Sequence, residues 1–235
     1  MKKQTLFNEK AVVSEIGDGL KKYVEEEIFP RYERFYSHGM LHIKSVIDNN
    51  LMLAKYYDLN LEMAFVVAAF HDLGLSANRE THEKESGKIL ASEVKLKKFF
   101  NDEQITIMKE AVEDHRVSRK TRPRNFYGEC LSDADRDFEI EILAKRQLAT
   151  SIKNYPDLET GEEHFERCYE YICRRLNNEG HFNLWTNNPI LVERREKFEK
   201  EFLDKDYARG IYLKEFERIS KDGTLDKIKD FYEDY

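Results

Sequence analysis

Two histidines and two aspartates lie at positions where they could bind a metal ion together. His42 comes four residues before Val46, so it lies on or beside the inward face of its helix. His71 and Asp72 end the apolar segment LEMAFVVAAFHD, and Asp133 lies among apolar residues at helical spacing. A buried imidazole or carboxylate is costly unless it is paired or ligated. Mixed nitrogen and oxygen donors suit a divalent ion such as Mn, Fe, Co, Ni or Zn, and suit Mg less well.

Each of these residues also has an ordinary structural interpretation. A single inward histidine is more often a core residue with satisfied hydrogen bonds, and His38 could face the core instead of His42. Asp72 could be solvated at its helix end, and Ser132 could cap a helix with Asp133 in its first turn. The ordered set, rather than any single member, favours a metal site of the kind that helix bundles build from facing side chains.

The elements that would position these residues are helices. Apolar residues recur at helical spacing and never alternate over a long segment, which predicts an all-α fold without a substantial sheet. The expected helices cover residues 8–29, 38–57, 60–72, 82–98, 102–117, 126–150, 161–178, 188–220 and 223–232. We expect one domain over residues 1–235. Its core would span about 36–140, with the helix 8–29 and the helices of 161–232 packed on that core.

Several helix ends can be assigned from residue types. Asn60 can cap the helix that begins there, and Thr81 can cap the helix that follows it. Gly74 lies where a left-handed residue would end a helix. Asn188 followed by Pro189 predicts a capped helix start with proline at the first helical position.

The composition excludes several classes of protein. The chain of 235 residues has 39 Lys and Arg against 46 Asp and Glu, for a net charge of -7, which is unlike a protein that binds duplex nucleic acid. It has 1 Trp, 13 Tyr and 15 Phe, too many aromatic residues for a disordered chain. The 3 cysteines do not form a disulfide framework. We expect no secretory signal, no membrane partner and a cytoplasmic location.

The motifs occur in an order that is typical of one protein family. The segments are S-H-G-M-L-H-I-K-S-V, then A-A-F-H-D-L-G, then L-S-D-A-D-R. Over about residues 36–140 the chain resembles the HD-domain superfamily of metal-dependent phosphohydrolases, and in particular its small bacterial members. The resemblance implies a multi-helix HD bundle with a C-terminal helical extension. It also implies that the metal ligands are His42, His71, Asp72 and Asp133.

The resemblance further implies metal-assisted hydrolysis of a small phosphorylated molecule, with a nucleotide as the favoured substrate. A bound cation lowers the pKa of its water and polarises a phosphoryl oxygen. The catalytic residues would be Asp72 and Asp135, although Glu83 and Asp114 are also adjacent to site residues and could transfer protons. An HD-type di-iron oxygenase and a non-catalytic nucleotide-binding module remain alternative functions. The sequence contains neither G-x-x-x-x-G-K-[ST] nor G-x-G-x-x-G.

Two later histidines extend the pattern. His82 lies in T-H-E-K-E-S, which resembles the family's H-x-x-x-S segment, and His115 lies in V-E-D-H-R. In relatives, histidines from these regions bind a second metal or contact substrate phosphate. We treat both as candidate substrate-binding residues and leave open a second metal site or a purely structural role.

A basic segment follows His115. Residues 116–124 carry five cations, and Pro123 should prevent a helix there, so the segment is expected to form a loop. Because arginine binds phosphate well, the loop could hold substrate phosphates, although a solvated surface is equally consistent with the charges. The candidate phosphate ligands are Arg119, Lys120, Arg122 and Arg124.

Overall fold

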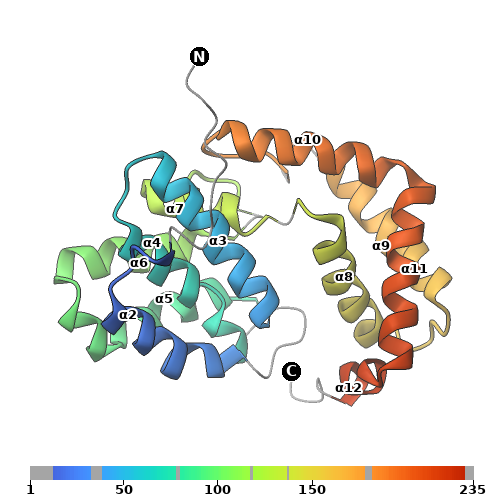
Figure 1. Cartoon of the computed structure of the whole chain (residues 1–235), viewed down its shortest axis with the longest axis horizontal. Coiled ribbons are helices and arrows are strands. Elements are labelled where there is room, and N and C mark those ends of the chain that lie inside the picture. The colour runs from blue at the N-terminus through green and yellow to red at the C-terminus, as the bar shows by residue number, and fades with distance from the viewer. Residues whose placement is uncertain are drawn as a thin grey trace. The chain divides into compact units, whose positions relative to one another are not determined.

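A computed structural model describes residues 13–32, 39–77, 80–116, 119–136, 138–177 and 182–230. Within these ranges every regular element is helical, which confirms the all-α prediction (Figure 1). His38 and the first residues of the expected helix 8–29 lie outside the described residues.

By its internal contacts the chain forms two compact units. The first comprises Met1–Tyr32 and Ile43–Asp135, and the second comprises Glu33–His42 and Arg136–Tyr235. The C-terminal helices that were expected beyond the HD core are therefore present as a unit with its own contacts. That they pack on the core, within a single domain, stays a prediction.

The first unit contains most of the shorter helices. Its elements are α2 (Asp18–Tyr23), the π-helical turn η1 (Val24–Ile28), the 3-10 turn η2 (Phe29–Tyr32), α3 (Met40–Tyr56, except its first three residues, which are grouped with the second unit), α4 (Leu61–Phe70), the 3-10 turn η3 (Leu73–Ser76), α5 (His82–Ser92), the 3-10 turn η4 (Val94–Lys98), α6 (Asp102–Asp114) and α7 (Phe126–Ala134). Helix α4 is apolar on all sides, and every residue from Met63 to Phe70 is buried. It contacts α5, α6 and α7, so it forms the centre of this unit.

The predicted N-terminal cap of α4 is confirmed, and the predicted cap of α5 is not. The Asn60 side chain accepts a hydrogen bond from the Met63 amide at 2.9 Å, which confirms it as the cap of α4. Thr81 precedes α5 but makes no side-chain cap hydrogen bond. The N-terminus of α6 has a capping box formed by Asn101 and Gln104.

Glycine is required at position 74 because a side chain would not fit there, and not because of the backbone conformation. The prediction of a left-handed residue was wrong, because its φ is not positive. A Cβ atom at Gly74 would lie 2.2 Å from the backbone oxygen of His82 and 2.6 Å from the amide of Ser86. The Gly74 amide donates to the Ser86 hydroxyl at 2.8 Å. This close approach places the start of α5 directly against the segment that follows α4.

The second unit is a set of helices around aromatic side chains. Its helices are α8 (Ile140–Asn154), α9 (Gly161–Leu176), α10 (Pro189–Leu203), α11 (Lys205–Lys221) and α12 (Thr224–Asp230). Helix α11 contacts each of the other four (Figure 1). Phe165, Phe198, Phe202 and Tyr212 are fully buried. Asn188 caps α10 and Pro189 is its first residue, as expected.

Two long helices expected from the sequence are each interrupted. The helix 126–150 ends at Ala134 and resumes at Ile140, and the helix 188–220 is divided at Asp204. Asp204 has an extended backbone, and its side chain accepts from the Tyr207 amide at 3.1 Å. A polar side chain that caps a new helix competes with helix continuation, whereas apolar spacing alone does not reveal the break.

Candidate metal centre

Three helices of the first unit end in a polar residue of the predicted site. His71 follows the last residue of α4, His115 follows α6, and Asp135 follows α7. These three helices contact one another. Because the C-terminus of a helix carries partial negative charge, several converging C-termini favour a cation.

Backbone hydrogen bonds fix the orientation of two imidazoles. The Nδ1 atom of His71 donates to the Ala68 carbonyl at 2.8 Å, and the Nδ1 atom of His115 donates to the Val112 carbonyl at 2.6 Å. Each bond satisfies a carbonyl in the last turn of a helix, where carbonyl groups lack helical partners. With Nδ1 committed to a carbonyl, Nε2 is the atom that can bind a metal.

The Asp72 carboxylate lies among three imidazoles. Its Oδ2 is 3.2 Å from Nε2 of His71, while its Oδ1 is 3.4 Å from Nε2 of His82 and 3.7 Å from Nε2 of His115. The ring centroid of His115 is 5.1 Å from that of His71 and 5.3 Å from that of His82. One carboxylate oxygen thus faces His71, and the other faces His82 and His115.

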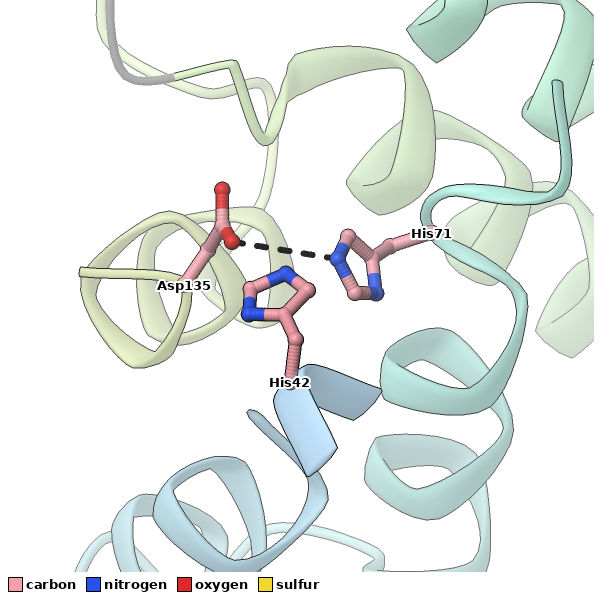
Figure 2. Close-up of side chains that lie close together, drawn as sticks. All are labelled: His42, His71 and Asp135. Carbon is pink, nitrogen blue, oxygen red and sulfur yellow. Dashed lines mark ion pairs between the residues drawn. The ribbon is translucent and has the colours of Figure 1, made fainter. Parts of the chain in front are cut away.

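The ligand atoms form two groups that share His71. Those of His71, Asp72 and His115 lie within 4.8 Å of one another, and so do those of His42, His71 and Asp135. Figure 2 shows the second group, with its side chains directed toward one another and a dashed line between His71 and Asp135. The His71 Nε2 and Asp135 Oδ1 atoms are 3.8 Å apart. His42 belongs to the first turn of α3, a continuous helix. This donor set fits a divalent metal ion, because it combines fixed imidazoles with carboxylates.

His71 has a raised proton affinity. Burial by itself lowers its pKa, but the carboxylates of Asp72 and Asp135 outweigh burial and raise the pKa to about 9. A group of negative charges that holds a proton this tightly is also suited to hold a metal cation.

Comparisons with known proteins identify the fold. No family model matches the chain, and no curated protein matches it. A predicted HD superfamily hydrolase from an uncultured Thermotogales bacterium, solved by crystallography, superposes with a TM-score of 0.52 and 20% sequence identity. The match covers 86% of this chain and 98% of that chain. The chain has the fold of an HD superfamily protein. This likeness concerns the fold alone, and it confirms the architecture that the motifs implied.

Within the HD fold, Asp135 rather than Asp133 lies beside His71. Asp133 is fully buried in the last turn of α7 and belongs to neither ligand group, whereas Asp135 follows the helix end and faces His71. The ligand role of Asp133 and the catalytic role of Asp135 stay predictions, and the geometry favours Asp135 as the ligand. Ser132 lies inside α7 and does not cap it.

The cations of the basic loop bind carboxylates of the chain itself. Arg122 forms two hydrogen bonds with Glu129, at 2.7 and 3.0 Å. Arg124 donates to Asp114 through Nε at 2.8 Å and through Nη2 at 3.1 Å, and Arg119 Nη1 is 2.7 Å from the same carboxylate. These pairs favour a structural role for the three arginines, although their predicted contact with substrate stays a prediction.

Two further residues of this region were predicted to act in the reaction, Lys120 as a phosphate ligand and Asp114 in proton transfer. Lys120 is exposed, as Arg122 and Arg124 are, but it forms no ion pair with a carboxylate of the described residues, so a phosphate could approach it from solvent. Asp114 is buried and accepts from the Arg124 amide at 2.8 Å in addition to its arginine contacts. Because its oxygens are occupied, Asp114 is poorly placed to transfer protons, and it instead anchors the chain that follows His115.

The described helices include none that is both long enough and apolar enough to cross a membrane.

Proposed function

We propose that this protein is a metal-dependent phosphohydrolase that hydrolyses a phosphate ester or anhydride of a small molecule, with nucleotides as the favoured class. The observation that carries the proposal is the Asp72 carboxylate among the Nε2 atoms of His71, His82 and His115, in a chain with the HD fold.

The residues of the site have separate tasks in such a reaction. A divalent ion bound here would acidify a bound water and polarise a phosphoryl oxygen. His71, Asp72 and Asp135, with His42, would hold it, and the backbone bond at Nδ1 keeps the His71 imidazole from rotating. The helix C-termini and carboxylates repel a phosphate, so substrate binding depends on cationic groups, and Lys120, Arg122 and Arg124 are exposed in the loop.

The Asp72 carboxylate also supports a site for two ions. Its Oδ2 faces His71 while its Oδ1 faces His82 and His115, so the two oxygens could bind different ions. This observation keeps the HD-type di-iron oxygenase as a second candidate function, because that chemistry needs a second metal at His82 and His115. A non-catalytic nucleotide-binding module would need no such donor set.

We also propose a cytoplasmic protein whose partner is a small phosphorylated substrate. The net charge of -7 opposes binding to duplex nucleic acid.

The test is a screen of the full chain after removal of bound metal. The protein is reloaded separately with Mn²⁺, Co²⁺, Ni²⁺ or Mg²⁺ and offered nucleotides and simple phosphate esters, and phosphate release is measured. We expect release with at least one transition metal and a weaker response with Mg²⁺. Nucleotide binding without turnover would support the binding module instead. Oxygen consumption by the iron-loaded protein would support the oxygenase.

A further inference from the structure

The three histidines around Asp72 differ in what can fix their rings. His71 and His115 follow helix C-termini, where free carbonyl groups accept their Nδ1–H groups. His82 is the first residue of α5. At the N-terminus of a helix the backbone presents free N–H groups and not free carbonyls. An acceptor for the Nδ1–H of His82 must therefore come from a side chain or from outside the helix.

Glu83 offers such an acceptor. Its Oε2 is 3.6 Å from Nδ1 of His82, and its side chain is only 13% exposed. This oxygen is shielded from solvent and receives no hydrogen bond from the described residues. A buried carboxylate oxygen without a donor is costly, so its retention needs a reason. A movement of about 0.5 Å would bring the two atoms to hydrogen-bond distance.

Arg116 also lies close to the Glu83 carboxylate. Its Nη1 is 3.6 Å from the same Oε2, and it also donates to the Glu80 carbonyl at 2.6 Å. Because Arg116 directly follows His115, it connects the start of α5 with the chain that leaves α6. The positive charge of Arg116 therefore lies close to the same carboxylate oxygen that faces His82.

We propose that Glu83 is a positioning residue for His82. Its carboxylate accepts the Nδ1–H group of His82 and so directs Nε2 of His82 toward Asp72 and the metal. Carboxylates that accept from a ligating histidine fix its tautomer and orientation in many metal sites. The inference rests on the proposed metal centre, takes His82 as a further ligand of it, and adds Glu83 as a residue that supports this ligand.

The experiment measures Co²⁺ binding by the full chain after removal of metal, from visible absorption and by competition with a chelator. The variants are Glu83→Ala, Glu83→Gln and the control Glu85→Ala. Glu85 lies in the same first turn of α5 but binds Lys88 on the surface, so it reports any general effect of charge. We expect Glu83→Ala to weaken Co²⁺ binding by about 10–100-fold and to change the absorption spectrum. Glu83→Gln keeps an acceptor oxygen and should retain most of the affinity, and Glu85→Ala should behave as the wild type.

A double-mutant cycle separates positioning from folding. If Glu83 acts through His82, Glu83→Ala should cause no further loss of Co²⁺ affinity in a His82→Ala background. Equal losses in Glu83→Ala and Glu85→Ala, or wild-type affinity and spectrum in folded Glu83→Ala, would overturn the proposal. Co²⁺ binding without hydrolysis would reject the phosphohydrolase and leave the positioning role intact, whereas a wild-type protein that binds no Co²⁺ would reject both.

Discussion

His71 in the first unit and His164 in the second are both buried, and they have opposite properties. The carboxylates around His71 outweigh its burial and raise its pKa to about 9. His164 lies against the Phe216 ring and is hydrogen-bonded to the Ser151 hydroxyl at 2.8 Å, and burial lowers its pKa. The comparison shows that the neighbours of a buried histidine, and not its burial, distinguish a candidate ligand from a core residue.

The two cores differ in the same way. In the first unit, polar residues at the ends of α4, α6 and α7 converge on one point. In the second unit, the buried centre is aromatic, with Phe198 packed against the rings of Phe138 and Phe202. We therefore expect substitutions of the converging polar residues in the first unit to affect chemistry, and substitutions of the buried aromatic residues in the second to affect stability.

The largest effect is expected from Asp72→Ala. Loss of the carboxylate that faces three imidazoles should remove bound metal and lower hydrolysis by more than about 100-fold. Mutation of a residue that only hydrogen-bonds to a metal ligand already costs about 10–100-fold in metal affinity or activity. The helical circular dichroism signal should persist. Metal content and turnover of the purified variant are the measurements.

The matched control for Asp72→Ala is His164→Ala. This variant should keep metal and turnover while losing about 1–3 kcal/mol of stability, because a buried hydrogen bond is broken. Equal loss of metal in both variants would contradict the division of roles between the units.

A large effect on stability alone is expected from Phe198→Ala. Removing a fully buried ring should cost about 3–5 kcal/mol in the free energy of unfolding, measured by urea denaturation. Leu203→Ala, at a side chain that is 58% exposed near the end of the same helix, should change it by less than about 0.5 kcal/mol. Metal affinity should stay at the wild-type value in both variants, and a large change in either would argue against the comparison.

A smaller effect distinguishes the two interpretations of the basic loop. Arg124→Ala leaves the buried Asp114 carboxylate with fewer donors and should cost about 1–3 kcal/mol of stability, toward the lower end because solvent reaches the arginine. Its KM should stay close to that of the wild type, whereas Lys120→Ala should raise KM a few-fold at unchanged kcat. Steady-state kinetics and thermal unfolding of both variants are the test. A raised KM without lost stability in Arg124→Ala would restore its predicted phosphate contact.

The smallest effects concern pH, and they have opposite signs in the two units. In the metal-free protein, the raised pKa of His71 means that the folded state holds its proton more tightly than the unfolded chain. That stabilisation is complete below about pH 6.5 and is lost as the pH rises through about 9. The lowered pKa of His164 means that stability instead falls as the pH decreases below about 6.5.

These two pH dependences can be separated by unfolding measurements. His164→Ala should remove the acid-side dependence, and His71→Ala should remove the alkaline-side dependence of the metal-free protein. If either variant keeps the wild-type dependence of stability on pH, groups other than the substituted histidine control stability in that pH range.

Several features of the site follow from short sequence segments. The apolar run that ends in His71 and Asp72 predicted a buried helix that delivers two polar groups, and α4 is buried along nearly its whole length. The choice between Asp133 and Asp135 could not be made in this way, because apolar spacing continues past the point where α7 ends. The polar run D-R-D after Ala134 was the available signal for that end.

The sequence by itself determined the all-α fold, the capped starts of α4 and α10, and the order of the site residues. These depend on contacts between neighbours in the chain, which residue types and spacing encode directly. Only the tertiary structure decided that Arg124 binds Asp114, that Asp72 faces three imidazoles, and that Glu83 lies between His82 and Arg116. Those contacts depend on where helices end and how they cross, and no local pattern of residues specifies either.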